Sequence, residues 1–102
     1  MNVIADLCVV PVGTELSLSP YVAEAEKILD RRGLKPKLHA YGTNIEGEWD
    51  EVMAAIKHCH KAIHGQGVPR ISTTIKLSTR TDRDQTIEDK VRSVTEKLNN
   101  SR

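Results

Sequence analysis

The sequence predicts an α+β fold in the order β-α-β-β-α-β, with one additional helix at the C-terminus. Two hydrophobic patterns carry this prediction, because segments with apolar residues at every second position alternate with segments at the 3.6-residue spacing of a helix. Proline, glycine and small polar residues separate these segments. The order is the split βαβ arrangement of ferredoxin-like domains, in which two helices lie on one face of a four-stranded antiparallel sheet.

The first strand and helix occupy residues 3–33. Residues 3–12 are β-branched and apolar on nearly both faces, as in a central strand, with Asp6 as the exception. Ser19-Pro20 predicts the start of a helix, with the Ser19 hydroxyl as N-cap and the proline at the first helical position. Apolar residues then recur at helical spacing as far as Gly33, which predicts the end of the helix.

A hairpin and a second helix follow. Residues 34–43 alternate as a strand, Gly42-Thr43-Asn44 has the composition of a turn, and residues 45–47 form a short return strand. A helix is predicted from Glu48 to His64, because it has an apolar stripe and acidic residues in its first turn.

The last strand and the C-terminal helix complete the pattern. Residues 70–79 alternate, and the final helix carries an apolar stripe of Ile87, Val91, Val94 and Leu98. Asp82, with Gln85 three residues later, is typical of a capping box at the start of that helix.

Composition indicates one globular domain spanning residues 1–102. Hydrophobic residues make up 38% and charged residues 28% of the chain, and the formal net charge is +1. A charge so close to zero, with one Trp, two Tyr and no Phe, gives no support to a nucleic-acid partner. No apolar run approaches the roughly 20 residues that span a bilayer, and the first residues lack the basic start of a signal peptide. We therefore expect a cytoplasmic protein with no membrane partner.

One face of the predicted sheet has no helix to cover it. From the later strands, that face is expected to carry His39, Tyr41, Ser72, Thr74 and Lys76. From the first strand, it carries one of two alternating sets of residues, and the set with Ile4, Asp6, Cys8 and Val10 is the more polar. This mixture of polar and aliphatic groups suits a partner subunit, a small ligand of mixed polarity, or both. Since a face of this kind is rarely left uncovered on a monomer, we predict a homo-oligomer, with a tetramer as the favoured state.

Three stretches form a set of motifs that covers nearly the whole chain. They are Val10-Pro11-Val12-Gly13-Thr14, the run from Gly42 to Val52, and the run from Arg70 to Ile75 followed by Thr79-Arg80-Thr81-Asp82. Together they resemble the YkoF-like, thiamine-binding protein family, especially its fungal branch. The resemblance implies a ferredoxin-like fold, tetramers built from dimers, and binding of thiamine or its hydroxymethylpyrimidine part. It implies no established enzymatic activity.

The resemblance also suggests ligand-binding residues. It puts Thr43, Asn44 and Glu46 near the pocket, with Thr14 from the first loop, and we add His39 from the open face. Side chains of these types supply the donors and acceptors that an aminopyrimidine needs. Glu46 has an alternative role as a cap of the second helix.

A cationic thiazolium ring favours a carboxylate or an aromatic face. Glu46 and Asp6 are candidates for the carboxylate, and Tyr41 and Trp49 for the ring. At its place in the second helix, Trp49 has the alternative role of a packing anchor.

A second candidate site binds an anion. Arg80, Thr81 and Arg83 precede the C-terminal helix, so two guanidinium groups, a hydroxyl and free backbone N–H groups could converge there. The alternative is a solvated loop in which Asp82 and Asp84 pair with the arginines. A functional anion site would instead indicate an oligomeric structural or regulatory module that binds sulfate or phosphate.

Neither a metal nor a cofactor is expected. His60 and His64 are four residues apart and share a helix face, but the sequence offers no third ligand nearby. Cys8 and Cys59 are expected to be free thiols. The chain has no phosphate-binding glycine loop and no Ser-His-Asp spacing, so we expect no enzymatic activity. An enzyme that uses His39 with Asp6 is the least favoured of the three functions.

Overall fold

The computed structural model describes residues 1–13 and 17–101, and its elements follow the predicted order. They are β1 (Asn2–Val12), α1 (Ser19–Arg31), β2 (Lys37–His39), β3 (Gly42–Glu48), α2 (Trp49–Gly65), β4 (Arg70–Thr79) and α3 (Ile87–Asn100). The four strands form one antiparallel sheet in the order β2-β3-β1-β4. The prediction of a ferredoxin-like α+β fold with an extra C-terminal helix is therefore confirmed.

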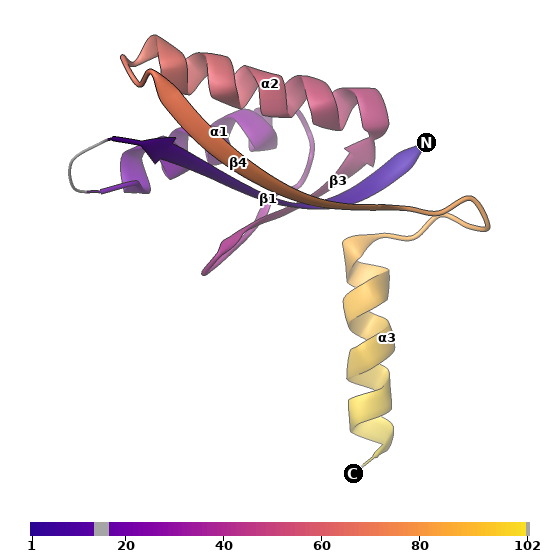
Figure 1. Cartoon of the computed structure of the whole chain (residues 1–102). Helices are drawn as coiled ribbons and strands as arrows, with labels where there is room; N and C mark the ends of the chain where they lie inside the picture. Colours follow the sequence, from indigo (N-terminus) through magenta and orange to yellow (C-terminus); the bar gives the residue numbers. More distant parts are fainter. Residues whose placement is uncertain (14–16, 102) are drawn as a thin grey trace.

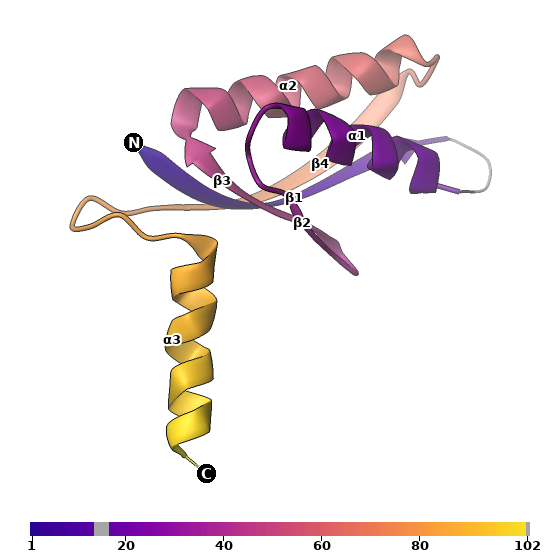
Figure 2. The ribbon, with the colours of Figure 1, turned by 180° about the vertical axis from the view of Figure 1, so that it is seen from behind.

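Two helices cover one face of the sheet, and the third stands on the other side. Figure 1 shows α1 and α2 above the strands and α3 leading away below them. The view in Figure 2 is from behind and brings α1 to the front of this helix layer. The core lies between the sheet and the two helices, where the apolar stripes of both helices meet alternate residues of β1 and β3.

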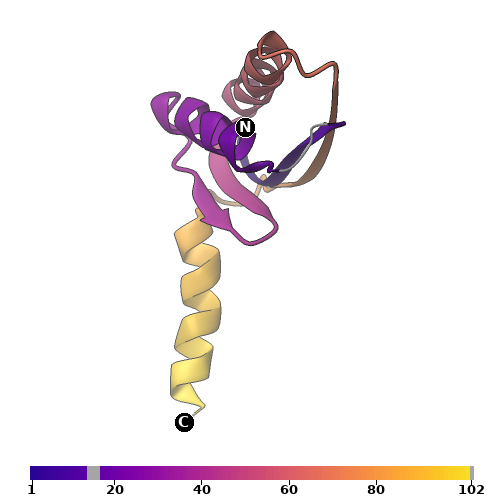
Figure 3. The same ribbon diagram turned by 90° about the vertical axis from the view of Figure 1, so that its left-hand side faces the viewer.

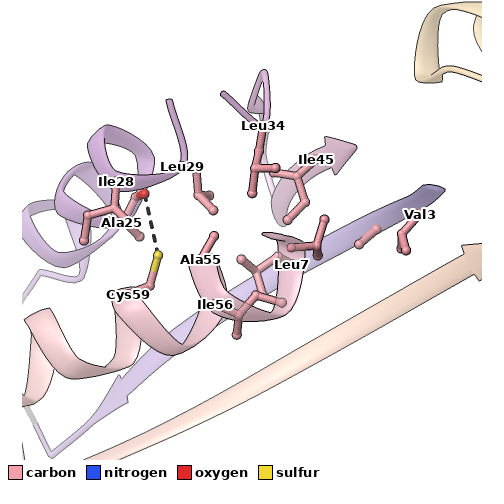
Figure 4. Packing of buried hydrophobic residues seen from close by; sticks show 12 residues of the cluster. Val3, Leu7, Ala25, Ile28, Leu29, Leu34, Ile45, Ala55, Ile56 and Cys59 are labelled. Carbon is pink, nitrogen blue, oxygen red and sulfur yellow. Dashed lines mark hydrogen bonds between the residues drawn. The ribbon is translucent and has the colours of Figure 1, made fainter. Parts of the chain in front are cut away.

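The core shows which of the two alternating sets of β1 residues faces the helices, a choice that the sequence left open. Val3, Ala5 and Leu7 are buried against the helices, whereas Asp6 and Cys8 point to the open face and are only half-buried. Figure 4 shows Leu7 and Val3 of β1 beside Ile45 of β3 and residues of both helices. Complete burial of an aliphatic side chain contributes about 1.5–3 kcal/mol, so this layer holds the helices on the sheet.

The hairpin between β2 and β3 turns earlier than predicted. The turn is formed by Ala40 and Tyr41, so the prediction of a turn at Gly42-Thr43-Asn44 is wrong, and the expected strand over residues 34–43 is reduced to Lys37–His39. Gly42 is instead a strand residue that lets two backbones approach, because a Cβ there would lie 2.8 Å from the carbonyl oxygen of Leu7. Tyr41 consequently lies in the turn, 87% exposed, and not within a strand on the open face.

Two helix starts also differ from the prediction. Leu18 is the N-cap of α1 and makes no side-chain cap, so Ser19 is the first helical residue and not the cap. At α3 the capping box is formed by Thr86 and Asp89 and not by Asp82 and Gln85, which lie before the helix. The reason is that the chain must first cross from the end of β4 to the open face before α3 can begin.

α3 projects from the body of the molecule. The view in Figure 3 shows it standing away from the sheet, with its C-terminus far from both other helices. The radius of gyration is 15.4 Å, compared with about 13 Å for a compact chain of 100 residues. No residue of α3 is buried, and Val91, Val94 and Leu98 are each about 60% exposed. None of the helices in the described part of the chain is both long and apolar enough to cross a membrane.

Candidate functional site

A cavity of about 610 Å³ lies between α1 and the sheet and is here called the α1 cavity. Its walls come from the outer half of β1, the β2–β3 hairpin and one side of α1, and most of them are apolar. The lining residues of the hairpin are Leu38, His39, Ala40, Tyr41, Gly42 and Thr43. Pockets for small molecules generally enclose about 300–1,000 Å³, so the volume fits a ligand of that class.

The cavity follows from the unequal lengths of the strands. β3 pairs with β1 only between Asn2 and Leu7, whereas β4 pairs with β1 as far as Val12. Beyond Leu7, therefore, β1 has no paired strand on the β3 side within the described part of the chain, and residues Cys8–Val10 line the cavity. α1 lies across this gap and closes it from the helix side.

Glu26 is the acidic group of the α1 cavity. It lies on α1, and its Oε1 accepts a hydrogen bond of 2.6 Å from the hydroxyl of Thr43, which is only 6% exposed. The other oxygen, Oε2, is buried and finds no hydrogen-bond partner among the described residues. Buried carboxylate oxygens are normally satisfied, so an unpaired one beside an apolar cavity indicates a place for a donor from a ligand.

Glu26 is not among the site residues predicted from the sequence, although the sequence contains a signal for it. Val22, Glu26 and Leu29 are spaced four and three residues apart, so the carboxylate falls on the apolar side of the helix. An acidic residue at such a position needs a partner, and the structure supplies one in Thr43.

His39 and Asp6 lie together at the edge between the cavity and the open face. The Nε2 of His39 is 2.6 Å from Asp6 Oδ1, and the Nδ1 of His39 accepts a 3.2 Å hydrogen bond from the Tyr41 backbone N–H. Because a backbone N–H can only donate, the neutral ring carries its proton on Nε2 and donates it to the carboxylate. Both ring nitrogens are thus occupied, and the pair fixes the turn that forms one wall of the cavity.

The predicted ligand-binding residues separate onto different sides of the sheet. Thr43 and His39 line the α1 cavity. Asn44 lines a separate cavity of about 380 Å³ on the open face, under the first turns of α3. The side chain of Glu46 accepts a 2.9 Å hydrogen bond from the Ile87 N–H, so it caps α3 and not the second helix. Thr14 lies outside the described residues.

The loop before α3 is held by its own acidic groups. Arg80 donates to Asp82 through both Nε and Nη2, and its Nη1 lies 3.4 Å from Gln85. The hydrogen bond from Arg80 lowers the pKa of Asp82 to about 2. Thr81 and Arg83 are exposed. Asp89 and Glu46 occupy the N–H groups of Thr86 and Ile87, so the geometry resembles the solvated-loop alternative more than an open anion site.

The three histidines of α2 are engaged separately. His60 Nε2 is 2.6 Å from the Thr73 hydroxyl, His64 Nδ1 is 2.7 Å from the Val68 carbonyl oxygen, and His58 contacts Arg32. Burial, with a smaller effect of His64, lowers the pKa of His60. Over residues 1–13 and 17–101, no group of three or more His, Cys, Asp or Glu side chains could hold a metal ion.

Both cysteines are free thiols. Cys59 is buried beneath α1, where its Sγ lies 3.8 Å from the carbonyl oxygen of Ala25 (Figure 4). Burial raises the pKa of this thiol to about 11, which leaves it protonated and unreactive. Cys8 is half-buried and belongs to the lining of the α1 cavity.

The fold and the cavity together define the class of the protein, a ferredoxin-like domain with a pocket of small-molecule size. Residues 5–95 match the family described as thiamine-binding protein. A UPF0045 protein of Synechocystis is 57% identical over 101 residues, which cover 99% of this chain and 84% of that protein. The UPF0045 protein ECM15 of Eremothecium gossypii is 46% identical over 99 residues, or 96% of this chain and 94% of the relative.

Solved structures of similar proteins have the same fold. A hypothetical protein of Methanocaldococcus jannaschii has a TM-score of 0.85 at 33% identity, over 93% of this chain and 97% of that one. A Thermotoga maritima protein assigned provisionally to thiamine biosynthesis or salvage shares the fold, with a TM-score of 0.79 at 23% identity over 92% of this chain and 99% of that one. The chain belongs to the thiamine-binding protein family, and the likeness to ECM15 fits its fungal branch.

Proposed function

We propose that the protein binds thiamine or its hydroxymethylpyrimidine part in the α1 cavity and releases the ligand chemically unchanged. The observation that carries the proposal is Glu26, whose second carboxylate oxygen is buried without a hydrogen-bond partner in residues 1–13 and 17–101, beside a mostly apolar cavity of about 610 Å³. Membership in the thiamine-binding protein family supports the choice of ligand.

The chemistry of the cavity suits this ligand class. An aminopyrimidine offers an exocyclic amine, which can donate to the free oxygen of Glu26, and flat faces that pack against apolar walls. The torsion that turns a glutamate carboxylate is broad, so Oε2 can rotate toward the ligand while the Thr43 hydroxyl remains in reach. The positive thiazolium ring of thiamine is attracted by the same carboxylate.

Isothermal titration calorimetry with thiamine and hydroxymethylpyrimidine tests the proposal. Glu26→Gln keeps the size of the side chain and removes its charge, and we expect it to weaken thiamine binding about 10-fold or more, since a hydrogen bond to a charged group contributes about 1.5–3 kcal/mol. Glu24→Gln is the matched control, because it removes a carboxylate from the same helix outside the cavity lining. Equal losses in the two variants, or binding unaffected by Glu26→Gln, would contradict this site.

The absence of catalysis is part of the proposal. His39, the one imidazole that lines the cavity among the described residues, has both nitrogens in hydrogen bonds, which leaves it poorly suited to act as a base. Thiamine recovered intact after prolonged incubation with the protein is the expected result. Cleaved or modified thiamine would favour the enzyme alternative built on His39 and Asp6.

We also propose that the chain assembles with copies of itself through α3 and the open face of the sheet, with a tetramer as the favoured state. The accessible surface is 7087 Å², whereas a monomeric protein of this mass exposes about 5,800 Å². The excess, about 1,300 Å² for one chain, is larger than the roughly 800 Å² that each partner buries in an interface of standard size. Light scattering should give a multiple of the 11.4 kDa chain mass, and Leu98→Asp should lower it.

The proposed compartment is the cytosol, where the two free thiols remain reduced. Oligomers that bind sulfate or phosphate through Arg80, Thr81 and Arg83 are the alternative function. They receive less support, because Asp82 already occupies the guanidinium of Arg80.

A further inference from the structure

We propose that the α1 cavity selects the unphosphorylated alcohol form of its ligand and rejects the corresponding phosphate esters. The inference rests on the proposed function, and it deepens that proposal by assigning the chemical form of the ligand. It is carried by two independent features of the cavity: its charge, and the state of the backbone N–H groups at the start of α1.

The described lining of the cavity contains an acidic group and no permanent cation. Among the described residues that line it, the ionisable side chains are those of Cys8, Glu26, His39 and Tyr41. Residues 1–26 contain neither lysine nor arginine, so the segment that joins β1 to α1 cannot supply a cation either. Lys37 is paired with Asn44 in the strand register and therefore shares the open face, and it does not line the cavity.

A helix N-terminus is the other common cradle for a phosphate, and the one at this cavity is already closed. Leu18 and Ser19 at the start of α1 line the cavity. The Ser19 N–H donates to the hydroxyl of Ser17, and Pro20 has no N–H. The N–H groups of Tyr21 and Val22 both donate to the Leu18 carbonyl oxygen. The first turn of α1 therefore offers no free N–H to an anion.

The imidazole of His39 does not replace these groups. Its Nε2 is bonded to Asp6 and its Nδ1 accepts from the backbone of Tyr41, so the neutral ring has no N–H left to donate into the cavity. A phosphate ester would thus lose its hydration without compensation and would lie in the same cavity as the Glu26 carboxylate. An alcohol group carries no charge, so it loses far less hydration free energy on burial than a phosphate and is not repelled by the Glu26 carboxylate.

The test compares matched ligand pairs by calorimetry at pH 7.5 and fixed ionic strength: thiamine with thiamine monophosphate, and hydroxymethylpyrimidine with its phosphate. We expect each phosphate to bind at least about 30-fold more weakly than its alcohol, which corresponds to about 2 kcal/mol. Equal or tighter binding of the phosphates overturns the inference while leaving the proposed function intact. Failure of all four compounds to bind overturns both.

Two variants separate charge from size as the cause. Tyr41 is 87% exposed at the rim of the cavity, so Tyr41→Lys adds a cation there with little risk to folding. We expect this variant to lower the ratio of alcohol affinity to phosphate affinity about 10-fold. The control Tyr41→Gln should leave this affinity ratio unchanged. Glu26→Gln should also lower the ratio of alcohol affinity to phosphate affinity, because it removes the negative charge that repels the phosphate. A ratio that stays the same in both Tyr41→Lys and Glu26→Gln would mean that size excludes the phosphate, and would overturn the electrostatic inference.

Discussion

Glu46→Gln distinguishes the structural role of Glu46 from the ligand-binding role that the family resemblance suggests. The carboxylate of Glu46 accepts the Ile87 N–H at 2.9 Å, at the positive end of α3, and it does not line the α1 cavity. Hydrogen bonds to a charged group contribute about 1.5–3 kcal/mol and neutral ones about 0.5–1.5 kcal/mol. Because glutamine keeps an oxygen acceptor, the expected loss is the difference, about 1 kcal/mol.

The loss of stability should be confined to the start of α3. α3 has no buried residue, so it can loosen at its N-terminus without unfolding the sheet. We expect hydrogen exchange of the Ile87 amide, measured by NMR, to become about fivefold faster, which is the factor that corresponds to about 1 kcal/mol. Thiamine affinity should remain within about twofold of the original value, since the bond lies outside the cavity.

Glu96→Gln is the control, because it removes an exposed carboxylate from the other half of the same helix. It should leave the exchange of the Ile87 amide unchanged. If Glu46→Gln weakens thiamine binding 10-fold while the exchange of Ile87 stays the same, Glu46 acts on the ligand and its role as a cap of α3 is refuted.

Three further substitutions test the geometry of the site and the core. Thr43→Val removes the hydroxyl that donates to Glu26. We expect the free energy of urea unfolding to fall by about 1–3 kcal/mol and thiamine binding to weaken. Thr43→Ser keeps the hydroxyl and should restore both the stability and the binding. Gly42→Ala places a Cβ 2.8 Å from the Leu7 carbonyl oxygen and should lower the free energy of unfolding by about 1–3 kcal/mol. In the control Gly65→Ala the new Cβ meets nothing within 4 Å, so the free energy of unfolding should hardly change. Equal effects of the two substitutions would contradict the close approach at Gly42. Burial and His64 hold the pKa of His60 below its usual value of 6.5, so the stability that depends on neutral His60 is present above pH 6.5 and is lost as the pH falls through the folded-state pKa. His60→Gln should therefore reduce the fall in unfolding free energy between pH 7.5 and 5, and an unchanged pH profile would count against this effect.

The sequence by itself determined the order of the elements and the two alternating sets of residues in the first strand, although not which set faces the helices. Both rest on local periodicity: alternate residues Val3, Ala5 and Leu7 are apolar, and the stripes of α1 and α2 recur at helical spacing. Patterns of this kind are complete within a dozen neighbouring residues, so no distant contact is needed to interpret them.

Only the tertiary structure decided where the hairpin turns, and with it which residues share a pocket. The pairing of Leu7 with Thr43 sets the register of β3, and a shift of one residue in a strand moves each side chain to the opposite face. Thr43 therefore faces Glu26 and the α1 cavity, while Asn44 and Glu46 face α3. The contacts at the site join residues 17 and 33 positions apart, as in Thr43 with Glu26 and His39 with Asp6, and local sequence patterns carry no information about pairs at that distance.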